Sequence, residues 1–514
     1  MSDRVNGDRH PRSEKSLTAD LSRALQEGDP QKISALIEAG ADIHYQREGG
    51  YNALLDAVHG LTRNTRLLDL LAWLAAQGVE LSAVSDYAES ALRVLSRFGR
   101  FDAVRLLLDA GADKNQLKWT PLMEAVALGS LDDVETVFKE SASLEARDWW
   151  SRTAWLIALL VGDISKAKLL AAWGADTNAC GRCGHPPLFY AVQSHSPQMV
   201  RWLLENGADV RQTDKFGSTA LIEAVENDDL ECVEILIEAG SDLEAHPYGT
   251  ALSIARSRNV LLCLLDAGAN PAELTYEGQR AMLNFPPIGD QALDDVSLDD
   301  FQRSFTRTFG RHNPERMRVP YWEAMIRCGA SAYGARNHFN KPFTLLHESV
   351  WCANRFGQSL TLLPDGRAIQ IGGEHEDSYD PDFCIYNDVF VHEPSGAITV
   401  YGYPESVFPP TDFHTATLAG HFIYVIGALG YYGTRRYGET SIYRLDSRTL
   451  QMERVEPEGK APGWIYNHRA TAFSPTAIRV WQGTVLTENN GKEASESNPH
   501  TYVLNLDLLR WTRQ

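Results

Sequence analysis

The sequence predicts an α-helical repeat solenoid followed by an all-β region. Two observations support this fold class. In the first half of the chain, glycines that can end a helix recur about every 33 residues, with apolar residues at helical spacing between them. From Phe343 onward the apolar residues alternate with polar ones and turn dipeptides become frequent, as is typical of β-strands.

The repeating unit is clearest over residues 216–243. Gly217 can form a tight turn, and Thr219 can cap the helix that follows it. A second helix begins near Leu230, and Gly240 can take the left-handed conformation that ends it. The unit is therefore predicted to be a turn followed by two helices.

Similar units flank this one on both sides. Their helix-ending glycines are Gly40, Gly78, Gly111, Gly174, Gly207, Gly240 and Gly268. Three of the intervals between them are 33 residues long. The interval of 63 residues between Gly111 and Gly174 fits two units, the first of which ends near Ser141 and Ala142 without a glycine.

A threonine-proline-leucine signature opens the first helix of one unit at Thr120-Pro121-Leu122. Variants of this signature begin at Thr153, Pro186, Thr219 and Thr250. Together with the period, the signature resembles the ankyrin repeat, which is about 33 residues long. The resemblance implies that residues 15–273 form an ankyrin solenoid, and we expect residues 1–14 to be a disordered leader.

The repeat register is lost after Pro271, and residues 274–336 are predicted to be a linker and a divergent helical repeat. Helices are expected over residues 298–309 and 321–327, and the second ends in a turn like those of the repeats. Stacked repeats need a terminal unit that covers their open hydrophobic end. We therefore predict that residues 297–336 cap the solenoid.

Residues 343–514 contain three segments that align with a period of 55 residues, with Gly372, Gly427 and Gln482 at the same position. The diglycine Gly372-Gly373 and a tryptophan after the last strand resemble parts of the kelch motif, a propeller blade of about 50 residues. Three blades are fewer than the four to eight that close a propeller. The resemblance therefore implies an all-β domain of three kelch-like blades that form a partial propeller.

An open array of three blades leaves strand edges unpaired, and such edges invite pairing with another chain. The strand over residues 502–506, with Trp511 beyond it, is apolar enough to be such an edge. It could be covered by a strand between Phe343 and Trp351, by the helix over residues 321–327, or by a second copy of the protein. We expect the helix to cover it and the full chain to be a monomer.

The charge of the chain bounds its partners. Acidic residues outnumber basic ones by 68 to 48, so the net charge is -20 and should repel nucleic acid and anionic membrane surfaces.

No run of 18 apolar residues is present, and the polar N-terminus lacks the apolar core of a secretory signal. The seven cysteines do not suggest a disulfide framework. We expect a cytoplasmic protein that binds neither nucleic acid nor membranes.

Three tryptophans are the candidate partner-binding residues. In the repeat register, Trp149 and Trp150 occupy turn positions that point away from the helical core, and Trp119 lies just before Thr120. These side chains either pack on neighbouring turns or are exposed. If exposed, they are good interface anchors, because tryptophan is enriched among the residues that dominate binding energy.

The most polar stretch, residues 372–388, carries six carboxylates and a histidine without any lysine or arginine. Crowded oxygen ligands suit Ca²⁺ or Mg²⁺. His375, Asp377 and Asp380, with His414, therefore define a possible polar or metal site. Alternatively, the carboxylates cap turns and accept backbone hydrogen bonds, and we expect this structural role and no bound metal or other cofactor.

No other motif indicates chemistry. Cys180 and Cys183, with His185, have zinc-like spacing, but no second ligand pair lies nearby. The sequence has no phosphate-cradling glycine pattern and no spacing that singles out a catalytic triad. We assign no catalytic residue and expect that the chain is not an enzyme.

Ankyrin and kelch arrays are mostly binding scaffolds, so both resemblances imply a protein that holds a protein partner. Stacked repeats also create a long concave surface rather than an enclosed pocket for catalysis. We therefore expect a partner on the concave ankyrin surface, with the β domain as a second binding or structural module. One alternative is a metal-dependent or enzymatic β domain centred on the loop over residues 374–388. Another is a β domain that self-associates through its open edges.

Overall fold

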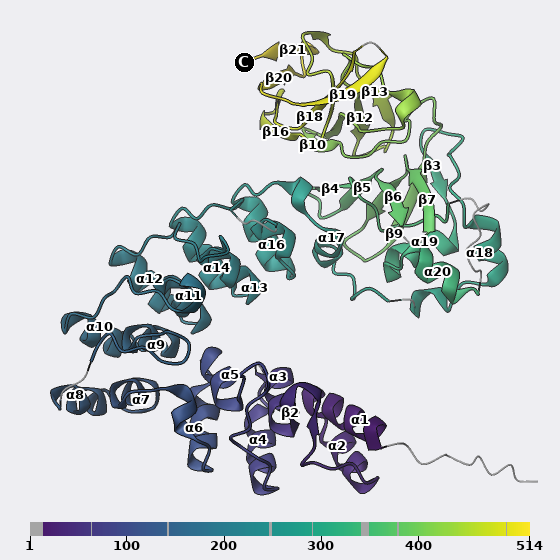
Figure 1. Ribbon diagram of the computed structural model, residues 1–514. Helices are drawn as coiled ribbons and strands as arrows, with labels where there is room; N and C mark the ends of the chain where they lie inside the picture. The colour runs from purple at the N-terminus through teal and green to yellow at the C-terminus, as the bar shows by residue number, and fades with distance from the viewer. Residues whose placement is uncertain are drawn as a thin grey trace, which may run out of the picture. The chain divides into compact units, whose positions relative to one another are not determined.

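The computed structural model describes residues 14–514 except residues 63, 141–142, 246–248, 290, 341–348, 378–379 and 490. The chain forms two compact units, Met1–Ala251 and Leu252–Gln514 (Figure 1). The predicted leader lies outside the described residues up to Glu14, where the first helix begins. Across the described ranges, no helix is both long enough and apolar enough to cross a membrane.

The first unit is a series of helix pairs joined by turns, as the repeat pattern predicts (Figure 1). The two helices of a pair pack against each other, and most first helices also pack on the first helix of the next pair. A two-residue hairpin of β1 (Gln46–Arg47) and β2 (Tyr51–Asn52) lies between the first two pairs. The helices of this unit are α1 (Glu14–Glu27), α2 (Pro30–Glu38), α3 (Ala53–Leu61), α4 (Leu67–Ala76), α5 (Ala91–Arg97), α6 (Phe101–Asp109), α7 (Pro121–Leu128), α8 (Leu131–Lys139), α9 (Ala154–Val161), α10 (Ile164–Ala172), α11 (Pro187–Gln193), α12 (Pro197–Glu205), α13 (Ala220–Glu226) and α14 (Leu230–Glu238).

Left-handed glycines end the second helices, as predicted. The φ angle lies between 73° and 98° at Gly40, Gly78, Gly111, Gly174, Gly207 and Gly240. Residues with a side chain rarely adopt this conformation, so glycine allows the chain to turn after each pair. The predicted threonine caps also form, because the hydroxyls of Thr120, Thr153 and Thr219 each accept a hydrogen bond from the backbone N–H three residues later.

Helix α9 is the most completely apolar and buried helix described in the first unit. Its residues Ala154, Trp155, Leu156, Ile157, Ala158, Leu159 and Leu160 are all buried. Helices α7, α10 and α11 pack on α9, so its apolar side chains are covered on most faces of the helix. The turn that leads into α9 carries Trp149 and Trp150, so both tryptophans lie next to a buried helix in the chain.

Helix α17 (Tyr276–Met282) of the second unit is joined by hydrogen bonds to the first sheet and to another helix. Gln279 on α17 accepts a hydrogen bond from Gln370 on strand β5 (Ala368–Ile371) at 2.6 Å. Arg280 on α17 donates to the carbonyl of Ile326 on α19 at 2.9 Å. The helices of this unit are α15 (Ala251–Ile254), which starts at the unit boundary, α16 (Arg258–Asp266), α17 (Tyr276–Met282), α18 (Leu298–Ser304), α19 (Pro320–Cys328) and α20 (Ala332–His338).

Three larger sheets follow one another along the chain (Figure 1). The first has the order β3-β9-β8-β5-β4, the second β10-β11-β12-β13 and the third β14-β21-β20-β17-β16. Neighbouring strands are antiparallel except β14 and β21, which are parallel. The strands of these sheets are β3 (Glu315–Met317), β4 (Ser359–Leu362), β5 (Ala368–Ile371), β8 (Val389–His392), β9 (Ile398–Gly402), β10 (Thr415–Ala419), β11 (Phe422–Ile426), β12 (Ile442–Asp446), β13 (Met452–Arg454), β14 (Glu458–Gly459), β16 (Arg469–Ser474), β17 (Ala477–Trp481), β20 (Tyr502–Asn505) and β21 (Arg510–Arg513). Two smaller sheets contain β6 (Glu374–Asp377) with β7 (Asp380–Ile385), and β15 (Trp464–Tyr466) with β18 (Thr484–Asn489) and β19 (Lys492–Ser497).

The three larger sheets share a local feature that the 55-residue alignment predicts. Gly372, Gly427 and Gln482 directly follow β5, β11 and β17, and each has a left-handed φ, of 59°, 76° and 58° respectively. Strand β10 of the second sheet lies against β4 of the first sheet and against β16 of the third. The described strands form neither a closed barrel nor a closed propeller, and the resemblance to kelch blades stays a prediction.

The segment predicted to cap the solenoid packs on the first sheet. Strand β3 pairs with β9 at the edge of the first sheet, and α19 contributes Tyr321 and Trp322 to a core shared with Trp351 and Phe390. The rings of Trp322 and Trp351 stack with centroids 4.8 Å apart. Residues 297–336 therefore belong to the sheet-rich unit, because their apolar side chains are buried against the first sheet.

The strand predicted to be a sheet edge is an inner strand in the structure. Strand β20 is not an edge, because it lies between β17 and β21, and Trp511 is a buried residue of β21. The sequence pattern missed β21 because a four-residue strand with one buried side chain has a weak alternating signal. The strand expected between Phe343 and Trp351 falls mostly outside the described residues.

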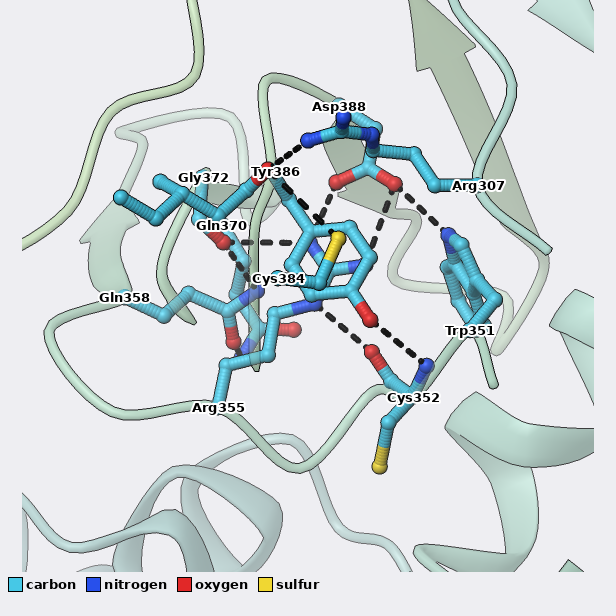
Figure 2. A network of polar contacts seen from close by, with 11 residues as sticks. Arg307, Trp351, Cys352, Arg355, Gln358, Gln370, Gly372, Cys384, Tyr386 and Asp388 are labelled. Atoms are coloured by element: carbon cyan, nitrogen blue, oxygen red, sulfur yellow. Dashed lines mark hydrogen bonds and ion pairs between the residues drawn. The ribbon is translucent and has the colours of Figure 1, made fainter. Parts of the chain in front are cut away.

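A buried arginine connects the loops of the first sheet (Figure 2). Arg355 forms an ion pair with Asp388, and its Nε and Nη1 also donate to the carbonyls of Cys352 and Gly372 at 2.7 and 3.1 Å. Its guanidinium carbon lies 3.5 Å from the centre of the Tyr386 ring. The carboxylate of Asp388, at the end of the acidic stretch, therefore has a structural role.

Candidate binding surface

The turn between α8 and α9 places Trp149 and Trp150 side by side. Asp148 shapes this turn, because its Oδ1 accepts the backbone N–H groups of Trp150 and Arg152, each at 2.8 Å. Ser151 takes a left-handed φ of 60° at the tip. Both tryptophans are half-buried, so part of each indole ring remains accessible.

A buried ion pair anchors this turn to α5. Arg152 donates through Nε and Nη2 to Oδ2 of Asp148 at 2.9 and 2.6 Å, and each side chain is only 1% exposed. Arg152 also donates to the carbonyl and the hydroxyl of Ser96 on α5. Because hydrogen bonds of a buried charged group are costly to break, the bonds from Arg152 to Ser96 fix the turn relative to α5.

Further hydrogen bonds hold the turn between its neighbours. The indole N–H of Trp150 donates to the carbonyl of Arg93 at 2.8 Å. The backbone N–H of Trp149 donates to the carbonyl of Leu117, and that of Arg182 donates to the carbonyl of Trp150. These bonds make the tryptophans part of a continuous row of turns.

Four basic side chains surround the two indole rings. The guanidinium carbon of Arg93 lies 3.5 Å from the Trp149 ring centre, and Nζ of Lys118 lies 5.0 Å from it. The guanidinium carbons of Arg182 and Arg97 lie 4.9 and 5.4 Å from the Trp150 ring centre. We call these six residues the Arg-Trp surface.

The positive charge of the Arg-Trp surface is not neutralised within the described part of the chain, where none of its four cations forms an ion pair with a carboxylate. Arg97, Lys118 and Arg182 are exposed. The pKa of Arg93 is lowered by burial and by the charge of Arg182. The surface is therefore locally basic in a chain whose net charge is -20.

A hollow of about 140 Å³ opens beside Trp150. Its lining includes Arg97, Arg152, Arg182 and His185. Liquid water occupies about 30 Å³ per molecule, so the hollow holds on the order of five waters or one side chain. The arrangement suits recognition of a group on another molecule.

Trp119 does not belong to the Arg-Trp surface. Its indole packs on the core of the preceding helices, with its ring 6.0 Å from that of Phe101. The sequence identified Trp149 and Trp150 but not the four cations around them. Arg93 and Arg97 are four residues apart on α5, and this spacing on one helix face is the signal that could have indicated part of the cluster.

The predicted polar site of the acidic stretch falls partly outside the described residues. His375 and His414 are buried, and Nε2 of His414 lies 2.8 Å from the hydroxyl of Ser359. Burial lowers the pKa of His414 to about 3. The side chains of Asp377 and Asp380 lie outside the described residues. Within the part that is described, no group of three or more histidine, cysteine, aspartate or glutamate side chains could hold a metal ion.

The cysteine pair lies at a neighbouring turn. Cys180 and Cys183 are free thiols, and His185 lies 3.4 Å from the carboxylate of Asp214. The histidine is thus placed against a carboxylate of the next turn. These contacts tie adjacent repeats together.

A pair of carboxyl groups lies where the acidic stretch meets the second sheet. Burial and the neighbouring carboxylate of Asp412 raise the pKa of Glu374 from 4.5 to about 7. Asp412 is fully buried, its Oδ1 accepts the N–H of Gly430 at 2.7 Å, and burial raises its pKa as well. Glu374 therefore carries a proton over part of the range below neutral pH.

Comparison with known proteins confirms the repeats. Residues 58–148, 142–214 and 188–275 match the family model described as ankyrin repeats in three copies. The chain therefore contains ankyrin repeats, and the match ends before the three larger sheets begin. The turns that carry Trp149, Trp150 and Arg182 lie inside the matched region.

Similar curated proteins match over part of their length only. The chain is 25% identical over 197 residues to the mitochondrial disaggregase of Homo sapiens, covering 37% of this chain and 27% of that protein. It is 29% identical over 141 residues to an L-asparaginase of Dirofilaria immitis, covering 27% of this chain and 24% of that protein. It is 30% identical over 144 residues to neurogenic locus notch homolog protein 2 of Homo sapiens, covering 27% of this chain and 6% of that protein. The chain thus spans about a quarter or less of the length of these relatives.

Among solved structures, the ankyrin repeat domain of Bcl-3, a member of the IkappaB protein family, matches 48% of this chain and 97% of its own length. The two sequences are 24% identical, and the TM-score is 0.23.

Arg152→Ala should lower the free energy of unfolding by about 3–5 kcal/mol, because it leaves the charge of Asp148 buried without a partner. Arg182→Ala, at an exposed arginine of the adjacent turn, should change it by less than about 0.5 kcal/mol. Urea unfolding followed by circular dichroism measures both. Equal stability losses in the two variants would contradict an anchoring role for the ion pair.

Glu374→Gln should flatten the dependence of stability on pH. Folding raises the pKa of Glu374 from 4.5 to about 7, so the folded chain holds a proton that the unfolded chain releases between these values. The contribution of this group to stability is therefore complete below about pH 4.5 and is lost as pH rises to about 7. Thermal unfolding at a series of pH values, with the exposed Glu405→Gln as control, measures the effect. If Glu374→Gln and the unmodified chain have the same dependence of stability on pH, Glu374 does not contribute to that dependence.

Proposed function

We propose that this chain is a non-enzymatic scaffold that binds a protein partner through the turn surface of its ankyrin repeats. Ankyrin repeats are generally protein-interaction modules, and their stacked turns offer an extended binding surface. The observation that carries the proposal is the Arg-Trp surface, in which two half-exposed tryptophans are held rigidly among four basic side chains. Tryptophan and arginine are the residue types most enriched at the energetic centres of interfaces.

Rigidity supports the same proposal. Ordering a side chain on binding costs about 0.5–1.5 kcal/mol, and a side chain that is already ordered avoids this cost. The indole of Trp150 is fixed by its hydrogen bond to Arg93, and the turn is fixed by Asp148 and Arg152. The surface is thus ordered before a partner arrives.

The sheet-rich region is proposed to be a second binding or structural module built from three kelch-like blades. The alternative of a metal-dependent or enzymatic site over residues 374–388 has less support, because Asp388 is paired with Arg355 and His414 contacts Ser359. A monomeric state and a cytoplasmic location stay predictions from the sequence, as does the lack of nucleic-acid and membrane partners.

Replacing both Trp149 and Trp150 with alanine should weaken partner binding by about 2 kcal/mol or more, which is about thirtyfold. The matched control is Phe138→Ala with Trp173→Ala, which removes a stacked aromatic pair from the α8 and α10 side of the same unit. Capture from a protein extract by the immobilised chain, followed by quantitative mass spectrometry, compares the three proteins. Circular dichroism checks that each variant keeps its helical signal. Equal recovery of the same proteins by both variants would contradict the proposal.

A further inference from the structure

The hollow beside Trp150 carries positive charge that the described part of the chain leaves uncompensated. Four groups in its lining are cationic or can become so, and two of them face carboxylates. Arg152 pairs with Asp148, and His185 lies 3.4 Å from Asp214. Arg97 and Arg182 are the two whose guanidinium groups have no carboxylate partner among the described residues.

Both arginines line the hollow and lie beside the same indole ring. Their guanidinium carbons lie over the Trp150 ring, 5.4 and 4.9 Å from its centre. No side-chain hydrogen bond uses their N–H groups within the described ranges, so both planar donor edges are available. A guanidinium group that stacks on an aromatic ring can still donate two parallel hydrogen bonds to a carboxylate.

We propose that this hollow binds a carboxylate side chain of an acidic protein segment, between the guanidinium groups of Arg97 and Arg182. The inference rests on the proposed function of the Arg-Trp surface and adds the chemistry of the partner. Lys118 and Arg93, around the adjacent Trp149, extend the positive charge to further carboxylates of the same segment. The hollow of about 140 Å³ has room for one side chain.

The observations favour an acidic protein segment over a nucleic acid. A single-stranded nucleic acid needs an open aromatic face on which a base can stack. The Trp149 ring has Arg93 3.5 Å from its centre, and Arg97 and Arg182 both lie over the Trp150 ring. The net charge of -20 also repels a long phosphate chain, whereas a short carboxylate segment senses mainly the local basic cluster.

Fluorescence anisotropy with the full chain tests the inference. The probe is a short fluorescein-labelled peptide in which glutamate alternates with alanine, and its counterpart has glutamine in place of glutamate. The glutamate peptide should bind and the glutamine peptide should not, and added salt should weaken the binding. Arg97→Glu with Arg182→Glu should weaken binding of the glutamate peptide by about tenfold or more.

Two variants control for general charge and for folding. Lys139→Glu with Lys168→Glu makes the same change in net charge on the exposed side of α8 and α10, and it should leave the affinity within about twofold. Arg97→Lys with Arg182→Lys keeps the charge but loses the planar donor edge, so it should bind with intermediate affinity. Equal weakening by the two glutamate variants would overturn the inference, because it would show that only net charge matters.

Other ligands give contrasting outcomes. Tighter binding of an oligouridylate, or of a phosphoserine version of the peptide, would overturn the carboxylate assignment. So would the absence of a saturable anisotropy change up to about 1 mM glutamate peptide. If the peptide fails while the Trp149 and Trp150 variant still loses its captured proteins, the scaffold function stands and only the acidic partner is wrong. If both experiments fail, the surface is not a binding surface.

Discussion

The buried ion pair of Asp148 and Arg152 is the interaction on which the candidate surface depends. Neither side chain has access to water, so each charge is stabilised only by the other and by its hydrogen bonds. The pair shapes the turn through backbone N–H groups and ties it to Ser96 on α5. Trp149 and Trp150 consequently stay where side chains from α5 and two neighbouring turns reach them. A flexible turn would not hold two indole rings among four like charges.

The sheet-rich unit also contains a buried ion pair, which here joins loops of the first sheet. Arg355 and Asp388 are buried together, and the carbonyls and aromatic rings around them complete the network (Figure 2). This pair joins the loop after Trp351 to the end of the acidic stretch. One carboxylate of that stretch is thus structural, and another, Glu374, is held beside Asp412 with a raised pKa. At least two acidic residues of this stretch therefore have separate structural roles, Asp388 in an ion pair with Arg355 and Glu374 beside Asp412.

Local rules explain what the sequence could predict. The helix pairs, the left-handed Gly207 and the cap at Thr219 depend on residues a few positions apart, and all were predicted. The packing of residues 297–336 on the first sheet was not predicted, because it depends on the contact of Trp322 with Trp351, which no local pattern reveals. The cations of the Arg-Trp surface were missed for a similar reason, because they come from three segments that only the folded repeats bring together. Trp119, the third candidate, packs on the core of the preceding helices and lies apart from these cations.

Hydrogen–deuterium exchange with and without the glutamate peptide tests most directly whether the Arg-Trp surface binds protein. The scaffold account predicts slower exchange over residues 91–97 and 148–153 and around Arg182 when the peptide is bound. It predicts unchanged exchange in α8 and α10, which carry none of the six residues of the Arg-Trp surface. Slower exchange confined to α8 and α10, or to the sheet-rich unit, would contradict the account.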